Sequence, residues 1–469
     1  MPEAKKEKIL LIYTSIKVAK ANYYSNGLGS IVAVLKENNF EVKVAYLFKF
    51  DDEEKIRLKG LINDFSPGLI GFTCVSSQFR FVKKIVDFTK MQFTSLQIVI
   101  GGVHPTLFPE LLLETKSIDY LFRGEAEQTF LEFCQKFFSG KPVKDIKGLG
   151  YLDQESKLVL NQMPELNNNL DALPEPDKET FNYGEIIKAA YGVATFIFNR
   201  GCPFSCTYCS NHALAKLYGL RNMSYRMRSV DLAIKEIFNV TSKYKLNYVV
   251  VIDEIMGLNH KWFMDFCREY KKHIKVPFAC SQRVDVIDKE KLSALKDAGC
   301  FEVRMGVESG NDYIRNILMN KQVKRETIIS AYALCRKFGL QTVANNMIGL
   351  PMETEEEICD TIALNRKILP TSSVVSVFYP YPGTKLEILC RETGLIDEDK
   401  AASGEIVERQ GSILKLPVSD KRLSWFVHSW ARLIYKDPMT ILRNPKSLFL
   451  DKVHSKIKRI FKQKKASSV

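Results

Sequence analysis

Short apolar segments alternate with amphipathic segments along the first 140 residues of the chain. Each apolar segment has the length of a parallel strand that is buried on both faces. Strands and helices that alternate at this pitch predict a doubly wound, Rossmann-like parallel sheet over residues 1–140. The expected strands are 8–13, 41–47, 69–74, 97–100 and 120–122, and the expected helices are 29–38, 55–65, 79–92 and 109–115.

The same alternation returns between residues 191 and 382. Six strand and helix units of this kind predict a partial (β/α)6 barrel of the TIM type at 191–390, in which reactive side chains lie at the carboxyl ends of the strands. The expected strands are 193–198, 248–252, 278–281, 301–306, 341–347 and 374–378, and the helices between them centre on 232–243, 261–273, 288–298, 325–338 and 353–368.

Two further stretches lack this alternation. Residues 141–190 are predicted to form a connector, with a hairpin at 148–159 and a proline-punctuated linker at 171–176. Residues 391–469 are predicted to form a helical C-terminal extension, in which 425–435 packs on the barrel or over its mouth. The expected fold class is therefore α/β, with two α/β domains and a helical extension.

The last segment has the pattern of a basic amphipathic helix. Asn444 and Pro445 suit the N-cap and the first helical position. Apolar residues follow at helical spacing from 449 to 461, with lysines and arginines mostly between them. Such a helix could lie on an anionic membrane surface, or it could be an ordinary terminal helix docked on the protein. The sequence leaves both alternatives open.

Composition and charge narrow the class of protein. The apolar fraction of 46% is that of a globular chain, and no apolar run approaches the ~18 residues of a spanning helix. Eleven cysteines without a disulfide framework indicate a reducing compartment. Residues 421–469 hold 13 Lys or Arg and two Asp, so this tail carries +11 of the net charge of +14. We therefore expect a cytoplasmic protein, peripheral on the inner membrane surface if the tail binds lipid, without a nucleic-acid-binding face.

Three cysteines close to the start of the predicted barrel carry the sharpest chemical signal. Cys202, Cys206 and Cys209 form a C-x3-C-x2-C pattern directly after the first barrel strand. Thiolates at this spacing can hold an iron–sulfur cluster from one short loop, and three ligands leave one of four irons open. A zinc site with His212 as the fourth ligand is the alternative from spacing alone.

The flanking residues favour the cluster. The run from Arg200 to Cys209, Arg-Gly-Cys-Pro-Phe-Ser-Cys-Thr-Tyr-Cys, resembles the signature of the radical S-adenosylmethionine (SAM) superfamily. The resemblance implies that Cys202, Cys206 and Cys209 are the metal ligands and catalytic residues of a [4Fe-4S] cluster, and that the open iron chelates SAM. It also implies that reductive cleavage of SAM yields a 5′-deoxyadenosyl radical.

Further motifs follow the other predicted barrel strands. The adjacent carboxylates Asp253 and Glu254 could bind an ammonium group or be a ligand-free acid pair at a helix start, and the fork of Arg283 suits a carboxylate. Each motif alone is weak, but their order along the strands is similar to that of the superfamily. The resemblance implies a SAM-binding set of Tyr208, Asp253, Glu254, Arg283, Glu308, Ser309, Asn345 and Ile348.

The N-terminal sheet alone could be a mononucleotide binder, a response-regulator-like module or a structural unit. Its place before a radical SAM core, and the elements Ile100–Pro105 and Arg123–Glu127, resemble the cobalamin-binding domain of the B12-dependent radical SAM enzymes. The D-x-H-x-x-G motif is absent, so the lower cobalt ligand is left unspecified, and His104 is expected to pack in the glycine loop near the nucleotide tail. The resemblance implies a cobalamin-binding set of Thr73, Val75, Ser76, Ser77, Gly101, Gly102, Val103, His104, Gly124 and Glu125.

The resemblance implies a C-methyltransferase. One SAM would supply the radical that takes hydrogen from an unactivated carbon, methylcobalamin would give the methyl group, and a second SAM would restore it. The same architecture could instead perform cyclisation, oxidation or ring contraction. An RNA methylthiotransferase would need three more N-terminal cluster cysteines, whereas residues 1–140 hold only Cys74 and Cys134; a non-catalytic cobalamin carrier is also less favoured. The expected partners are a small-molecule or lipid-like substrate and an electron donor such as ferredoxin or flavodoxin.

Overall fold

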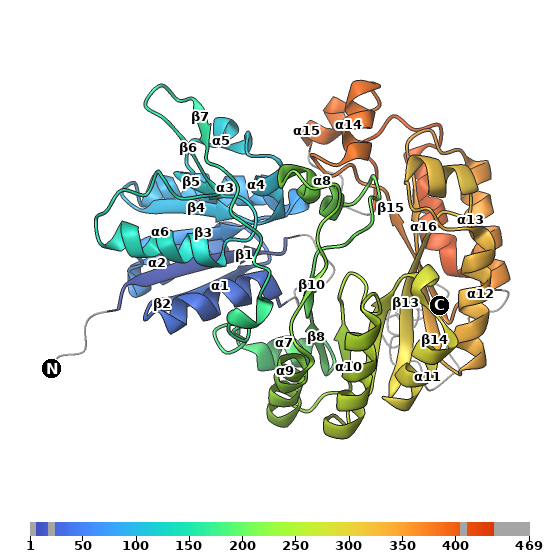
Figure 1. The fold of residues 1–469 in the computed structure, drawn as a ribbon. Coiled ribbons are helices and arrows are strands. Elements are labelled where there is room, and N and C mark those ends of the chain that lie inside the picture. Colours follow the sequence, from blue (N-terminus) through green and yellow to red (C-terminus); the bar gives the residue numbers. More distant parts are fainter. Residues whose placement is uncertain (1–5, 17–23, 404–409, 436–469) are drawn as a thin grey trace, which may run out of the picture.

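The computed structural model describes residues 6–16, 24–403 and 410–435. Its N-terminal part is a doubly wound sheet (Figure 1), as predicted. Five parallel strands pair in the order β2-β1-β3-β4-β5. Their bounds are β1 Lys8–Thr14, β2 Glu41–Leu47, β3 Leu69–Thr73, β4 Gln97–Gly101 and β5 Tyr120–Phe122.

Helices cover both faces of this sheet because successive strand residues point to opposite sides. Ile9 and Leu11 of β1 pack in one core with helices α1 (Asn26–Glu37) and α6 (Glu127–Phe138). Leu10 and Ile12 pack in a second core with α2 (Asp52–Phe65) and α3 (Phe79–Gln92). Continuous apolar strands are thus buried on both sides, which is what the sequence pattern requires.

The helix expected at 109–115 is present as the short helix α5 (Leu111–Glu114), and a second short helix that was not predicted, α4 (Val103–Leu107), precedes it. Phe108 and Pro109 lie between them. A proline disfavours the helical conformation of the residue before it, and Phe108 has a φ of −133° and a ψ of 70°. The break at Phe108 therefore ends α4, which begins directly after Gly102 in the glycine loop that follows β4.

The connector contributes to the first sheet. Its predicted hairpin is present as β6 (Leu149–Leu152) and β7 (Leu158–Leu160), and β6 pairs antiparallel with β5, so the sheet has seven strands. The chain then passes through the short helices η2 (Leu170–Ala172) and α7 (Tyr183–Ala189) to the second domain.

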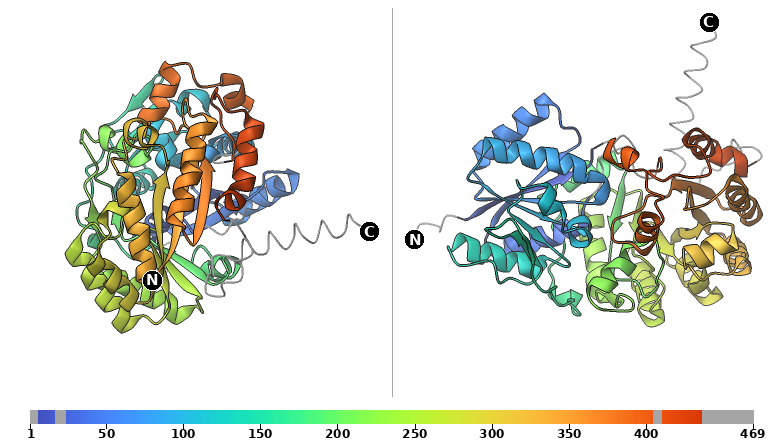
Figure 2. Two further views of the ribbon diagram at one scale, coloured as in Figure 1. Left: turned by 90° about the vertical axis from the view of Figure 1, so that its right-hand side faces the viewer. Right: turned by 90° about the horizontal axis from the view of Figure 1, so that it is seen from above.

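The second domain is the predicted half-barrel, and it lies beside the first domain (Figure 2). Six parallel strands pair in the order β15-β14-β13-β12-β11-β8, and the helices pack on the outer face of this curved sheet. The strands are β8 Val193–Phe196, β11 Tyr248–Val251, β12 Phe278–Gln282, β13 Cys300–Glu308, β14 Gln341–Ile348 and β15 Ser372–Val377. The helices are α9 Val230–Lys243, α10 His260–His273, α11 Lys289–Asp297, α12 Arg325–Lys337 and α13 Glu355–Ile368.

Shorter elements decorate the barrel. The strands β9 (Asn199–Arg200) and β10 (Arg226–Met227) form a small antiparallel ladder, and α8 (Ser210–Leu217) lies between them in sequence. The remaining short helices are η1 Ser76–Gln78, η3 Val284–Val286 and the π-helix η4 Ile314–Leu318, and those after β15 are α14 Lys385–Glu392 and α15 Glu398–Ser403.

The predicted helix at 425–435 is part of α16 (Asp420–Ile434), which packs on the barrel at β15 and α13. The Trp430 indole Nε1 donates to Ser373 Oγ at 2.9 Å and so fixes the helix to the strand. The predicted basic helix after Asn444 lies outside the described residues. Among the described residues, no helix is both long and apolar enough to span a membrane.

Substitution of two phenylalanines on neighbouring helices tests the packing of the core of the second domain. Phe266 on α10 is fully buried and stacks on Trp262, whereas Phe238 on α9 is half exposed. We expect Phe266→Ala to lower the free energy of unfolding by about 3–5 kcal/mol, because it leaves a cavity. The control Phe238→Ala should change it by less than about 0.5 kcal/mol. Urea denaturation of the two variants measures both values, and equal effects would contradict the packing described.

Candidate functional site

The loop with the three cysteines lies between β9 and α8, and neighbouring elements fix its backbone. The Thr207 amide donates to Met319 O at 3.0 Å, and the Asn320 side chain donates to Ser205 O at 3.0 Å. The amide of Leu386 at the start of α14 donates to Thr207 O at 2.9 Å. The segment after β13 and the segment after β15 therefore both hold the middle of the loop.

The thiols of this loop suit a cluster of soft metal ions. Burial raises the pKa of Cys202 to about 11 and that of Cys209 to about 12, with the Glu254 carboxylate acting in the same direction. These thiols therefore stay protonated near neutral pH unless a metal ion takes the place of the proton. Among the described residues, no three His, Cys, Asp or Glu side chains are arranged to hold a single metal ion.

The two-residue period of the strands decides which predicted SAM residues face the inside of the barrel. On β11, Val249 and Val251 pack outward against the helices, whereas Tyr248 and Val250 pack inside with Ala279 of β12. Continued past the strand, the alternation places Glu254 inside, on the same face. By the same count, Arg283 and Asn345 face inward from the ends of β12 and on β14.

Arg283 and Glu308 lie against the cysteine loop. The guanidinium of Arg283 stacks on the ring of Phe204, 3.8 Å from its centroid, and bonds to Asp285 Oδ1 at 2.8 Å. Glu308 ends β13 at an irregularity in its pairing with β14 and has a φ of +64°, a conformation that is strained for a residue with a Cβ. Its carboxylate pairs with Lys321 Nζ at 3.1 Å. Burial, followed by the charge of Glu308, raises the pKa of Tyr208.

Three members of the predicted SAM set lie apart from this inner face. Asp253 is buried behind the strand, where its Oδ1 accepts the amides of Phe198 and Asn199 at 2.6 and 3.2 Å. Its other oxygen has no partner, and burial raises its pKa to about 7. Ser309 is fully buried, and its Oγ accepts the amide of Asn311. Ile348 packs outward with α13 and α16.

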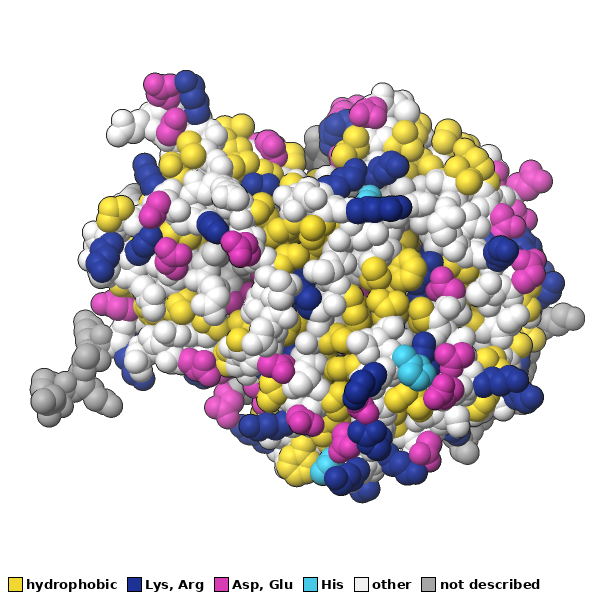
Figure 3. Space-filling view, viewed as in Figure 1, with side chains coloured by type: hydrophobic (Ala, Val, Ile, Leu, Met, Phe, Trp, Pro, Cys, Tyr) yellow, Lys and Arg dark blue, Asp and Glu magenta, His cyan; other side chains and the backbone are white. Residues whose placement is uncertain are grey.

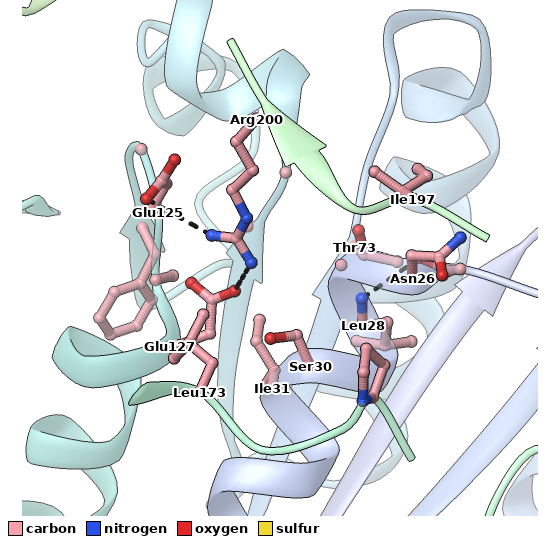
Figure 4. Close-up of a pocket in the computed structure, with 18 of the residues that line it drawn as sticks. Asn26, Leu28, Ser30, Ile31, Thr73, Glu125, Glu127, Leu173, Ile197 and Arg200 are labelled. Carbon is pink, nitrogen blue, oxygen red and sulfur yellow. Dashed lines mark hydrogen bonds and ion pairs between the residues drawn. The ribbon is translucent and has the colours of Figure 1, made fainter. Parts of the chain in front are cut away.

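A cavity of about 450 Å³ lies between the two sheets. From the first domain it is lined by the carboxyl ends of β3, β4 and β5 and by the first turn of α1; from the second domain it is lined by the ends of β8 and β11 and by α8. Figure 4 shows Thr73 and Asn26 of the first domain opposite Ile197, which follows β8. On the face seen in Figure 3, hydrophobic side chains run between the two domains, and charged side chains gather toward the rim.

Half of the predicted cobalamin set lines this cavity, namely Thr73, Gly101, Gly102, Gly124 and Glu125. The others, Val75, Ser76, Ser77, Val103 and His104, do not line it. His104 is buried between the rings of Phe79 and Phe108, and its Nδ1 lies 3.1 Å from Ser76 Oγ. Burial lowers its pKa to about 4, so this histidine is neutral at pH 7.

Glycines leave open room for a ligand in this cavity. A Cβ added at Gly27 would meet no atom within 4 Å, and one at Gly101 would meet only the Cβ of Phe122 at 3.9 Å. Both glycines line the cavity, so side chains there would fill space that is now open. The first domain therefore offers a cradle at the carboxyl ends of its strands, where doubly wound sheets bind ligands.

Sequence comparisons agree with both halves of the site. The B12 binding domain family matches residues 15–133, and the radical SAM superfamily matches residues 196–364. Together the two matches span more than half of the chain. The chain belongs to the radical SAM enzymes that carry a B12-binding domain.

The relatives of this radical SAM enzyme include two kinds of chemistry. An uncharacterised methyltransferase of Pyrococcus horikoshii is 29% identical over 77% of the chain and 77% of its own length. An anaerobic magnesium-protoporphyrin IX monomethyl ester cyclase of Rubrivivax gelatinosus is 26% identical over 76% of the chain and 66% of its own length. The solved structure of the methyltransferase TsrM from Kitasatospora setae, with cobalamin and a [4Fe-4S] cluster, shares the fold, with a TM-score of 0.69, 18% identity and coverage of 83% of this chain and 75% of that one.

The cofactors of this radical SAM enzyme are a [4Fe-4S] cluster, SAM and cobalamin. The residues present fit them: three thiols on one loop, an inward acid and an inward arginine beside that loop, and a glycine-lined cradle across the cavity. When bound, SAM and the cluster supply a 5′-deoxyadenosyl radical, and cobalamin supplies a cobalt centre that can carry a methyl group.

Several residues that line the cavity were not predicted from the sequence. The first turn of α1 contributes Ser25, Asn26 and Ser30, and the connector contributes Leu173 and Pro176. No motif marks these positions: the start of α1 reaches the cavity because this helix follows β1, and Leu173 and Pro176 reach it through the tertiary packing of the connector. Three charged residues between the domains also line it without having been predicted, namely Glu127, Arg200 and Arg226. Glu127 belongs to the Arg123–Glu127 element, and Arg200 begins the motif that contains the three cysteines.

The cysteine assignment predicts selective loss of the cluster. We expect Cys206→Ala to reduce bound iron from about four atoms per chain to near zero and to abolish 5′-deoxyadenosine formation. The control Cys359→Ala removes an exposed thiol on α13 and should keep both. Iron analysis, the visible spectrum and product chromatography after anaerobic reconstitution measure the outcome. Undiminished 5′-deoxyadenosine from Cys206→Ala would refute the assignment.

The register of β11 predicts different effects for two neighbouring acids. Glu254→Gln removes a charge that faces the cluster loop and should weaken SAM binding roughly tenfold or more. Asp253→Asn keeps an oxygen that accepts the amides of Phe198 and Asn199, so SAM affinity should stay within about twofold of the unmodified protein. Equilibrium dialysis of labelled SAM against the cluster-loaded variants measures both, and the opposite order would show that the outward acid binds SAM.

Proposed function

We propose that this B12-dependent radical SAM enzyme is a C-methyltransferase that acts on an unactivated carbon of a small molecule. One observation carries the proposal: predicted cobalamin residues and residues beside the cluster loop line a single cavity. Thr73, Gly101 and Glu125 come from the first domain, and Gly201 and Glu254 come from the second. A substrate in that cavity would face a radical source on one side and a methyl donor on the other.

The overall reaction balances with two molecules of SAM and two electrons. One SAM with one electron gives methionine and 5′-deoxyadenosine, the latter carrying the hydrogen atom of the substrate. The second SAM would provide the methyl group of the product and leave as S-adenosylhomocysteine, and the second electron would complete the balance. Both electrons come from an external one-electron donor of the ferredoxin or flavodoxin class.

The residues of the chain have separable tasks in this proposal. Glu254 would accept the ammonium of SAM and Arg283 its carboxylate, since both lie beside the cysteine loop. Glu308 would accept the ribose hydroxyls and Asn345 would contact the adenine, with Tyr208 beside Glu308. Asp253, Ser309 and Ile348 would hold the strand ends that carry these residues.

The cavity wall supports an uncharged reacting group. Ile197 follows β8 and Ile252 follows β11, the two strands nearest to the cluster loop. Their side chains are 36% and 39% exposed, respectively. Both line the cavity, as do Leu214 and Met223. Aliphatic side chains at the point of reaction exclude water, which protects a carbon radical from side reactions.

A second candidate function is radical cyclisation without methyl transfer. The similarity to the anaerobic cyclase of Rubrivivax gelatinosus favours it. The two reactions share the cavity, the cluster and the cradle, and they differ in the mass of the product. A methyltransferase adds one CH2 to its substrate, whereas a cyclase removes hydrogen and adds no carbon.

Deuterated SAM tests the proposal directly. Extracts of cells with and without the gene are incubated anaerobically with the reconstituted protein, cobalamin, a reductant and SAM carrying a CD3 group. We expect one metabolite that gains a single CD3 group, and its signal should vanish with Cys206→Ala. Mass spectrometry detects the gain. Formation of 5′-deoxyadenosine with a product that gains no CD3 would favour the cyclase alternative.

A further inference from the structure

The segment Gly124–Glu127 of the first domain touches both ends of the cluster loop of the second domain. Before the loop, the Arg200 guanidinium pairs with Glu127 and lies 3.4 Å from Glu125 (Figure 4). After the loop, the amide of Glu125 donates to the hydroxyl of Tyr218, which follows α8, at 3.3 Å. The chain between these two contacts carries all three cluster cysteines.

A fifth residue closes the network. Arg226 of β10 pairs with both oxygens of Glu125, at 2.9 and 2.7 Å, and it is the ladder partner of Arg200 in β9. Two arginines on one small ladder therefore meet two glutamates on one turn. We call Glu125, Glu127, Arg200, Tyr218 and Arg226 the interdomain clamp.

The backbone of the first domain at Gly124 lies close to Tyr218 of the second domain in the clamp. Gly124 has a φ of +82°, and a Cβ at this position would lie 2.2 Å from the Tyr218 hydroxyl. Glu127 and Arg226 are more than nine-tenths buried. Burial raises the pKa of Glu127, but the charge of Arg200 outweighs this and holds it below its usual value. The Glu127 carboxylate is thus ionised, and its ion pair with Arg200 persists at neutral pH.

Each charged member of the clamp has an oppositely charged partner within the clamp, although four of its members line the cavity. A charged group whose partner is already in place is poorly suited to recruit a charged substrate. Its effect is geometric, because bidentate pairs between a guanidinium and a carboxylate fix orientation as well as distance.

We propose that the interdomain clamp sets the separation of the corrin from the cluster, and that Glu127 and Arg200 are positioning residues. The cluster, as the source of the radical, and the corrin must both face one bound substrate, and an error of about 1 Å in such an arrangement can cost about 10²-fold in rate. This inference needs bound cofactors and is independent of whether the reaction is methylation or cyclisation.

The distance between the two cofactors can be measured without a substrate. Pulsed electron paramagnetic resonance on holoprotein with cob(II)alamin and a reduced cluster reports their spin–spin coupling. Glu127→Gln removes one charge of the clamp, and Arg200→Lys keeps the charge but loses the planar fork that reaches two carboxylates. The matched control is Glu132→Gln, which breaks a surface pair with Lys136 on the same helix as Glu127.

We expect the control to reproduce the unmodified coupling. Both clamp variants should keep iron and cobalamin at the unmodified level, and should shift the modal separation by about 1 Å or broaden its distribution. An unchanged distribution in both variants would overturn the proposal. Loss of cobalamin from both, with the cluster intact, would also overturn it, because the residues would then be part of the cobalamin cradle. Failure of the CD3 experiment leaves this measurement unaffected.

Discussion

Two parallel sheets point their carboxyl ends at one cavity, and the rest of the site depends on that face-to-face arrangement. In a parallel sheet, all strands end at the same edge, so loops that are far apart in sequence meet there. Thr73 and Gly101 end neighbouring strands of the first sheet, and Ile252 follows a strand of the second. The connector and the interdomain clamp prevent either edge from turning toward solvent.

Buried ions are an unusual way to join two domains, since apolar contacts of the same size would often be as stable. Taking a carboxylate and a guanidinium out of water costs several kcal/mol per ion, and only good geometry recovers this. A buried ion pair also fixes the connector to the second domain. Lys178 pairs with the buried Glu236 at 2.8 Å, although burial raises the pKa of Glu236. A buried ion pair tolerates few alternative packings, so such contacts define one relative orientation where an apolar surface would allow several.

Much of this arrangement could be predicted from the sequence. The apolar strands, the order of the two domains, the cysteine loop and the helix at 425–435 follow from local patterns, and the structure confirms them. The sequence pattern does not predict which of two neighbouring residues faces the site when both have similar chemistry. Asp253 and Glu254 are both acids at a strand end, and only the register of β11 places one behind the strand and the other beside the cluster loop. Glu127 and Arg200 both belong to recognisable sequence motifs. Their pairing, however, is a tertiary contact between residues 73 positions apart, which no local pattern predicts.

At Glu308, the backbone departs from the regular alternation of inward and outward side chains along β13. The pairing of β13 with β14 shifts between Gly306 and Glu308, so the strand gains one residue at its end. At this shift Glu308 has a φ of +64° and leaves the extended geometry of the strand. The left-handed turn directs its carboxylate to Lys321, whose carbonyl oxygen accepts from Arg283. Glu308 at the end of β13 is thereby linked through Lys321 to the arginine that stacks on Phe204 of the cysteine loop, and the ion pair with Lys321 helps to sustain the strained backbone at this position.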